Sequence, residues 1–221
     1  PIANILLSKN NKFLLVERFN YKKSTHQYLG FEEILVLHGK NRDEKYSGSY
    51  ESIAKTLFAV TTNKTLSMKY FYKTIIMNYL LKNGDAHLKN FAILYDKDIN
   101  KIYYSPAYDI VNTCVYIYQD RPALTLFGKK CWAGKKELIK FGMLHCFFSR
   151  TECSQYYAEC FCALKESITR LKQYIKQNKN FADIGSKMIT TWELSLKETQ
   201  YKELPVEIIR AWNKDKKSPQ R

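Results

Sequence analysis

The chain has 221 residues, with 36 lysines and arginines against 21 aspartates and glutamates, so its formal net charge is +15. Hydrophobic residues make up 45% of it and charged residues 26%, which is typical of folded domains and argues against a disordered tail, a coiled coil or a collagen-like chain. No apolar run approaches the roughly 18 residues of a membrane-spanning helix, and the first residues do not resemble a secretory signal. At about 150 residues per domain, the length predicts one large domain or two small ones.

Positive charge on this scale attracts phosphate groups, nucleic acid or acidic protein surfaces, or it is simply solvated. No zinc-finger, basic-zipper or RNA-recognition motif accompanies it, so charge alone does not predict nucleic-acid binding.

The cysteines lack the close pairing of zinc ligands, and the chain is too long for a small disulfide scaffold. Three of them, Cys146, Cys153 and Cys160, recur every seven residues, which predicts one stripe of a helix. We therefore expect a reduced, cytoplasmic protein in which most cysteines are core residues. The six are Cys114, Cys131, Cys146, Cys153, Cys160 and Cys162.

The first third of the chain contains three short predicted elements. Phe13–Val16 is an apolar run typical of a buried strand. Phe31–Leu37 is predicted to be a short helix that ends at Gly39, a residue suited to a helix C-terminus. The hydroxyls of 47–49 are placed to cap a second helix over Tyr50–Phe58.

The clearest periodicity follows. Apolar residues between Met68 and Leu80 recur at spacings of three and four, which predicts an amphipathic helix that stops at Asn83-Gly84. After a polar loop, Phe91–Tyr95 and Ile102–Tyr104 predict a β-hairpin.

The remainder of the chain is predicted to be mostly helical. Two further short strands are expected over Val115–Tyr118 and Ala123–Phe127. Helices are expected over 136–147, 152–177, 183–199 and 205–213. The predicted fold class is therefore mainly α with a small β component.

The polar loop contains a set of residues that suits phosphoryl transfer. Asp85 and Asn90 are five apart, as in the Asp-x₄-Asn catalytic loop of protein kinases, and Asp109 follows the hairpin, where kinases place a second metal-binding aspartate. A carboxylate can accept the hydrogen bond of an attacking hydroxyl, while an amide and a carboxylate suit Mg²⁺, which prefers oxygen ligands. The competing interpretation is that Asp85 belongs to a helix terminus and that Asp109 caps the next element.

Two further residues of the loop have open roles. His87 is either a structural hydrogen-bonding partner or, less favoured, a general base. Lys89 either touches the γ-phosphate as a point charge or is solvated.

Five segments, in the same order over residues 12–145, resemble the HipA family of bacterial serine/threonine kinase toxins. The loop 83–93 (NGDAHLKNFAI) looks like that family's catalytic loop. The other segments are 15–20 (LVERFN), 45–54 (KYSGSYESIA), 108–113 (YDIVNT) and 123–129 (ALTLFGK).

The resemblance implies a protein-kinase-like fold with ATP and Mg²⁺ as cofactors. Asp85 would then be the catalytic base, and Asn90 and Asp109 would hold magnesium. His87 and Lys89 are the further candidate catalytic residues of this loop. The backbone of Glu17, Arg18 and Phe19 would form the hinge against adenine.

The resemblance also implies a domain organisation. Residues 1–20 would be the end of an N-lobe and the hinge strand, and 21–221 the helical C-lobe. Because neither a phosphate-binding loop nor a strand lysine precedes Phe13, we expect the N-lobe to be missing from the chain, which alone should bind ATP poorly and transfer no phosphate.

Family members arrest growth, typically by phosphorylating an aminoacyl-tRNA synthetase, and pair with a helix-turn-helix antitoxin. The resemblance therefore implies a protein substrate, an antitoxin partner, possible help from a separate N-lobe chain, and contact with DNA only through the antitoxin. Two alternatives stay open. One is a small-molecule phosphotransferase, since aminoglycoside and choline kinases share the Asp-x-His-x-x-Asn pattern; the other is a non-catalytic module that binds an antitoxin or DNA.

Overall fold

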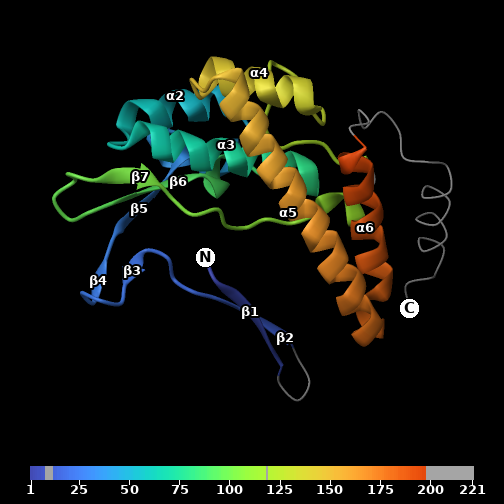
Figure 1. The fold of residues 1–221 in the computed structure, drawn as a ribbon. Coiled ribbons are helices and arrows are strands. Elements are labelled where there is room, and N and C mark those ends of the chain that lie inside the picture. Colours follow the sequence, from blue (N-terminus) through green and yellow to red (C-terminus); the bar gives the residue numbers. More distant parts are fainter. Residues whose placement is uncertain (8–11, 118, 198–221) are drawn as a thin grey trace.

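Helix α3 (Lys64–Leu81) is the central element of the structure, a computed structural model that describes residues 1–7, 12–117 and 119–197 (Figure 1). Ten of its residues are buried, among them Phe71, Tyr72 and Ile75 with no exposed surface. A helix that is apolar around most of its circumference is buried from several sides. The predicted helix is therefore confirmed, but it buries more than the single stripe that its periodicity indicated.

Four helices surround α3 or extend its packing: α2 (Tyr50–Val60), α4 (Lys135–His145), α5 (Arg150–Gln177) and α6 (Ala182–Leu196). Of these, α2, α5 and α6 contact α3 directly. Ser49 caps α2 by accepting a hydrogen bond from the Ser52 N–H at 3.1 Å, as its hydroxyl predicted. Within the described residues, no helix is long and apolar enough to cross a membrane.

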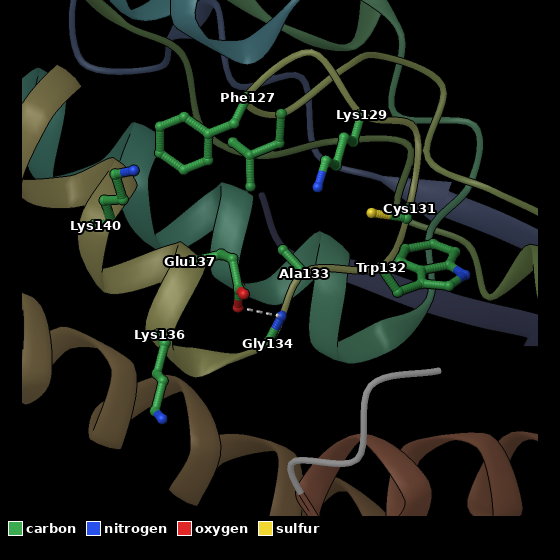
Figure 2. A pocket seen from close by; sticks show the side chains of 10 residues that line it. Phe127, Lys129, Cys131, Trp132, Ala133, Gly134, Lys136, Glu137 and Lys140 are labelled. Carbon is green, nitrogen blue, oxygen red and sulfur yellow. Dashed lines mark hydrogen bonds between the residues drawn. The ribbon is translucent and has the colours of Figure 1, made fainter. Parts of the chain in front are cut away.

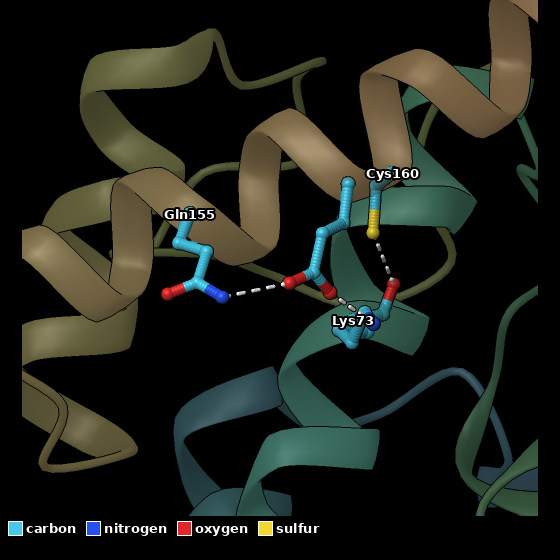
Figure 3. Close-up of polar contacts among 4 residues, drawn as sticks. Lys73, Gln155 and Cys160 are labelled. Atoms are coloured by element: carbon cyan, nitrogen blue, oxygen red, sulfur yellow. Dashed lines mark hydrogen bonds and ion pairs between the residues drawn. The ribbon is translucent and has the colours of Figure 1, made fainter.

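The contact between α3 and α5 includes a polar cluster on its surface (Figure 3). Lys73 Nζ lies 2.6 Å from Glu159 Oε2, and Gln155 donates to the other oxygen of that carboxylate at 3.1 Å. Because this ion pair is partly exposed, it contributes no more than about 1 kcal/mol. Burial of the aromatic and aliphatic side chains of α3 is the larger stabilising term.

The predicted β-hairpin is confirmed as β6 (Ala92–Tyr95) and β7 (Ile102–Tyr104). A third strand, β5 (Gly30–Glu33), pairs antiparallel with β6 and completes the sheet. The helix predicted over Phe31–Leu37 is thus wrong in its first half, and only α1 (Ile34–Leu37) is helical. Phe31 pairs with Leu94, so a partner 63 positions away overrides the local pattern.

Strands β1 (Ala3–Leu7) and β2 (Lys12–Val16) form a separate antiparallel hairpin, and β3 (Tyr21–Lys22) pairs with β4 (Gln27–Tyr28). Figure 1 shows the β1–β2 hairpin standing apart from the helices. The prediction of a buried strand over Phe13–Val16 is right in its type and wrong in its burial: Phe13 is 54% exposed and Leu14 71%. Among the described strands, β2 pairs with β1 alone, and the side chains of both faces are exposed.

Two predicted strands in the middle of the chain are wrong. Thr113–Val115 is a 3₁₀ turn, and no strand is described over the part of Val115–Tyr118 that the structure covers. Within Ala123–Phe127, Thr125 and Leu126 form only isolated bridges, to Ser49 and Lys129. Ala123, Leu124 and Leu126 are buried members of the core, so the hydrophobicity of this segment reflects the core and not a sheet.

The helices predicted over 136–147, 152–177 and 183–199 correspond to α4, α5 and α6. The helix predicted over 205–213 lies outside the described residues.

The cysteines match most of their prediction. Cys114, Cys146, Cys153 and Cys160 are buried free thiols, whereas Cys131 and Cys162 are exposed. The single stripe is wrong for its first member, because Cys146 ends α4 while Cys153 and Cys160 lie on α5. No group of three or more His, Cys, Asp or Glu side chains able to hold a metal ion occurs in the described part of the chain.

Gly142 provides a test of the packing between α3, α4 and α5. A Cβ at this position would lie 2.6 Å from Cys153 Sγ and from Tyr72 Cζ, both in the core. Gly142→Ala gains about 1 kcal/mol of helix propensity but overpacks the core, which costs about 1–3 kcal/mol. Because the added Cβ would meet two core atoms at 2.6 Å, we expect the upper part of this cost, and so a net loss of about 1–2 kcal/mol in the free energy of unfolding, measured by urea titration.

The matched control is Met143→Ala, which changes the adjacent, 41% exposed side chain. It should alter the free energy of unfolding by less than about 0.5 kcal/mol. Equal stability of Gly142→Ala and the unmodified chain would show that the helices are less closely packed than described.

Candidate functional site

The polar loop begins where α3 ends. Lys82 adopts a left-handed conformation with φ 59°, and the Asn83 N–H donates back to the Asn78 carbonyl at 2.8 Å, so the chain leaves the helix abruptly. The backbone of Gly84, which follows Asn83, passes close to two side chains. A Cβ there would lie 2.0 Å from Asp120 Oδ2 and 2.6 Å from Thr113 Oγ1. Any side chain here would have to displace these two groups, so the position favours glycine.

Asp85 is half-buried and held from two sides. The Tyr46 hydroxyl donates to Asp85 Oδ1 at 2.7 Å, and the Asp85 N–H donates to Asn83 Oδ1 at 3.2 Å. The hydrogen bond to Asp85 is the main cause that raises the pKa of Tyr46 to about 12. The phenol thus stays protonated and keeps donating throughout the neutral range. Asp85 Oδ2 makes no hydrogen bond to a described residue, which leaves it available to an incoming group.

Asn90 and Asp109, nineteen positions apart, are brought into direct contact. Asn90 Nδ2 donates to Asp109 Oδ2 at 2.7 Å, while Asn90 Oδ1 accepts from the His87 N–H at 3.0 Å. Asp109 has φ 54°, a conformation that aspartate tolerates better than most residues. Its carbonyl accepts from Asn83 Nδ2 at 3.4 Å, so the same amide that holds Asp85 also holds Asp109.

This pair fits a Mg²⁺ ion by the chemistry of its donors. A carboxylate and an amide carbonyl are hard oxygen ligands, and magnesium needs only one or two protein ligands because it retains several waters. In the structure the nitrogen of the Asn90 amide faces Asp109. An ion held by both residues requires the amide oxygen on that side, at the expense of one hydrogen bond from His87.

His87 is positioned as a structural residue. Its side chain is only 6% exposed, and its ring packs edge-on against Tyr46 with the centroids 5.3 Å apart. Burial is the main cause that lowers its pKa, so the imidazole is neutral near pH 7. No hydrogen bond joins its ring to Asp85 among the described residues, and Nδ1 has no partner. The geometry gives no support to a general base at this position.

Lys89 lies beside the pair but is directed toward an acid. Its Nζ is 3.8 Å from Glu33 Oε1, and its carbonyl accepts from the Tyr108 hydroxyl at 2.6 Å. Burial raises the pKa of Glu33, with Lys89 acting in the opposite direction. The lysine is about one-third exposed, so its ammonium can leave this long ion pair at small cost.

The segment predicted as a hinge reaches the site through one residue. Phe19 stacks on Tyr108 with the ring centroids 5.7 Å apart and also contacts Phe31 at 6.0 Å. Tyr108 is the neighbour of Asp109, so Phe19 is joined to the Asn90–Asp109 pair. Glu17 pairs instead with Lys23, and Arg18 lies over the Tyr28 ring at 5.8 Å, so neither side chain contacts the pair.

Several residues that build the site were not predicted. Tyr46 lies in a segment noted for its resemblance, but no local pattern indicates that its phenol meets a carboxylate 39 positions away. Thr113 accepts from the Gly84 N–H at 2.8 Å, and its own N–H donates to the Lys82 carbonyl at 3.1 Å. Trp132 donates from Nε1 to the Asp120 carbonyl at 2.9 Å, which holds Asp120 against the loop. These contacts depend on the tertiary fold.

Chemically, the site combines one carboxylate with a free oxygen and a second carboxylate paired with an amide. The first can accept a hydrogen bond or a proton from a hydroxyl group. The second can hold a divalent cation and, through it, phosphate oxygens. The thiol of Cys114, which follows Thr113, is buried, and burial raises its pKa to about 12, so it is not a nucleophile near neutral pH.

Comparison with known protein families gives a match to most of the chain. The family described as the HipA-like C-terminal domain matches residues 1–173. The candidate kinase Y4dM of Sinorhizobium fredii is 30% identical over 117 residues, which is 52% of this chain and 27% of that protein. A candidate kinase of Haemophilus influenzae is 34% identical over 103 residues, which is 45% of this chain and 30% of that protein. The matched regions thus span less than a third of either relative.

A solved structure has the same fold. It is the HipA, HipB and operator DNA complex of a toxin–antitoxin system from Shewanella oneidensis MR-1. The match has a TM-score of 0.71 and 16% identity, and covers 92% of this chain and 54% of that chain. At this identity the likeness establishes the fold alone.

Lys82, at the start of the loop, yields a prediction about pH. It is 4% exposed, its Nζ lies 4.8 Å from the Trp132 ring centroid, and burial lowers its pKa from 10.5 to about 8. Between these values the unfolded chain keeps a proton that the folded chain releases, so this group makes the free energy of unfolding rise with pH. The maximum effect is about 3 kcal/mol.

In the unmodified chain, Lys82 should make the free energy of unfolding rise between pH 8 and 10.5. We expect this contribution to be absent in Lys82→Met. Urea titrations at several pH values measure it. The control is Lys176→Met, which alters an exposed lysine on α5 and should leave the slope unchanged. Identical slopes for both variants would contradict the burial of a lysine with a lowered pKa.

Proposed function

The chain belongs to the family of HipA-like C-terminal domains, and on that premise we propose that it forms the catalytic lobe of an ATP-dependent kinase that phosphorylates a protein serine or threonine. The observation that carries the proposal is the convergence of three groups that are apart in sequence. Asp85 presents a free carboxylate oxygen, and Asn90 contacts Asp109 at 2.7 Å beside it. Phosphoryl transfer needs little covalent help, so positioning and charge neutralisation by such a set suffice.

In this proposal Asp85 orients the attacking hydroxyl. The Tyr46 phenol holds Oδ1, and the remaining oxygen accepts the hydrogen bond of the substrate serine. Tyr46 is thus a positioning residue, whose raised pKa keeps its proton on the phenol. His87 supports the loop through its backbone N–H and its contact with Tyr46, and does not take the proton.

Asn90 and Asp109 would hold Mg²⁺, which neutralises charge on the phosphates of ATP when it is bound. Asp109 is exposed, so its carboxylate can reach a nucleotide, while Asn90 is buried and fixed by the loop. Lys89 would leave Glu33 to contact the γ-phosphate. The backbone of 17–19 would contact adenine, with Phe19 joining this segment to Asp109 through Tyr108.

We further propose that residues 1–20 form the edge of an N-lobe and the hinge. The support is the exposure of apolar side chains on both faces of the β1–β2 hairpin, which an isolated two-stranded sheet does not sustain well in water. A covering layer of further strands on one face would bury Phe13 and Leu15, which lie on the same face and are each about half exposed.

At the level of the whole protein, we propose a toxin of a bacterial toxin–antitoxin system. Its substrate would be an aminoacyl-tRNA synthetase, its partner a helix-turn-helix antitoxin, and its effect the arrest of growth. The fold shared with the HipA of Shewanella oneidensis, which was solved with HipB and operator DNA, supports the choice of partner. The candidate kinases among the relatives support the choice of reaction.

Asp85→Asn tests the catalytic role in the full-length gene product. Loss of the accepting carboxylate should lower the rate of phosphate transfer about 10²–10⁴-fold, the range of general acid–base catalysis. Transfer of labelled phosphate from ATP to a panel of synthetases measures it, and thermal unfolding checks the fold.

Asp98→Asn, in the exposed turn between β6 and β7, is the matched control and should keep full activity. Activity within a factor of a few in Asp85→Asn would refute the assignment of this carboxylate.

Asp109→Asn tests the metal site without relying on turnover. The variant keeps the side chain's shape but removes a charged ligand, so the affinity for Mg²⁺ in the presence of a non-hydrolysable ATP analogue should fall at least about tenfold. Isothermal titration calorimetry measures it, with Asp96→Asn in the β6–β7 turn as the control. Unchanged magnesium affinity would exclude Asp109 as a ligand.

A further inference from the structure

A groove of about 620 Å³ opens between the segment 126–134 and the first turns of α4 (Figure 2). Three lysines, Lys129, Lys136 and Lys140, border it, and Phe127 and Trp132 contribute aromatic surface. We call it the basic groove. None of the residues assigned to catalysis or to metal binding lines it, so it is distinct from the site described above.

The charge of the basic groove is not balanced within the described chain. All three lysines are exposed, and none forms an ion pair with a described residue. The single acid in the lining, Glu137, accepts from the Gly134 N–H at 3.1 Å, as the dashed line in Figure 2 shows. That carboxylate caps α4, so the lining keeps two net positive charges.

The rest of the lining is apolar. Leu126 is 4% exposed and Trp132 is 7% exposed. The indole N–H of Trp132 already donates a hydrogen bond to the Asp120 carbonyl. Lys140 Nζ lies 4.9 Å from the Phe127 ring centroid, which places a cation directly over aromatic surface. A ligand that matches this surface has apolar groups for the floor and carboxylates for the rim.

The groove is tied to the candidate catalytic carboxylate through Tyr46. Lys130, between two lining residues, donates from Nζ to the Tyr46 carbonyl at 3.1 Å, and the Tyr46 hydroxyl donates to Asp85. The preceding residues are fixed to α2, because the Tyr50 N–H donates to the Thr125 carbonyl at 3.0 Å. A chain lying in the groove is therefore held at a set position relative to Asp85.

We propose that the basic groove binds an acidic segment of the protein substrate that contains several carboxylates and at least one large apolar side chain. This inference rests on the proposed function, because it names the class of substrate that the same site would accept. Charge complementarity is the reason for an acidic occupant, and the apolar lining favours a polypeptide over a nucleic-acid backbone. Lysine ammonium groups at the rim suit single carboxylates as point charges.

Fluorescence anisotropy tests the proposal on the full-length gene product. The probe is a labelled 15-residue peptide with a central serine, one leucine and five glutamates, and the comparison peptide has glutamine in place of each glutamate. We expect the acidic peptide to bind at least tenfold more tightly at 0.1 M salt, and to lose most of this preference at 0.5 M salt as the charges are screened.

Two triple variants with the same change in net charge separate the groove from the overall charge. Lys129→Gln, Lys136→Gln and Lys140→Gln together should weaken the acidic peptide at least tenfold. Lys97→Gln, Lys176→Gln and Lys179→Gln together, on exposed positions elsewhere, should change its affinity less than twofold. The single Lys136→Gln should give a partial loss and serves if the triple groove variant does not fold, because this side chain forms no ion pair or hydrogen bond with a described residue.

Different results would refute the kinase assignment and the proposed role of the basic groove. Binding of the acidic peptide by an unmodified protein that transfers no phosphate to any synthetase would refute only the kinase assignment. Phosphate transfer with equal affinity for both peptides, or equal losses in the two triple variants, refutes the groove. A 20-base-pair DNA duplex that binds through the same three lysines more tightly than the acidic peptide would also overturn it, in favour of a nucleic-acid surface.

Discussion

The geometry of the candidate site depends on one buried amide. Asn83 is 2% exposed, and its Nδ2 donates to Asn78 Oδ1 within α3 at 3.0 Å. The same side chain accepts from the Asp85 backbone and donates to the Asp109 carbonyl. Asn83 thus connects the backbone of both Asp85 and Asp109 to the end of helix α3. Leaving this amide unsatisfied in the core would cost about 1–3 kcal/mol, so its hydrogen bonds keep the loop in place.

Local signals predicted the elements that local chemistry determines. The period of α3, the hydroxyl cap of α2 and the turn between β6 and β7 each depend on residues close in sequence, and each is confirmed. Elements that depend on distant partners were missed. Strand β5 exists because β6 offers a free edge, and the apolar run of 123–127 is buried without any ladder. The strand over Phe13–Val16 was predicted to be buried because its residues are apolar, and an apolar run contains no information about what covers it.

The same division applies to the site. The spacing of Asp85, Asn90 and Asp109 and the resemblance to a family predicted which residues would matter, and the structure brings Asn90 and Asp109 together. Spacing could not indicate that Tyr46 contacts Asp85, or that Lys89 faces Glu33, because these distances are set by how the helices pack. It also could not separate the two roles of His87, which only its burial and its contact with Tyr46 distinguish.

The close approach at Gly84 bears on how this chain can diverge. Two oxygen atoms, from Asp120 and Thr113, occupy the space that any side chain would need, and both belong to residues that hold the loop. Selection for folding alone would therefore favour glycine at this position, whether or not a related chain has the proposed activity. Its presence in a related sequence is evidence of the shared loop geometry, whereas the proposed activity has to be judged from Asp85, Asn90 and Asp109.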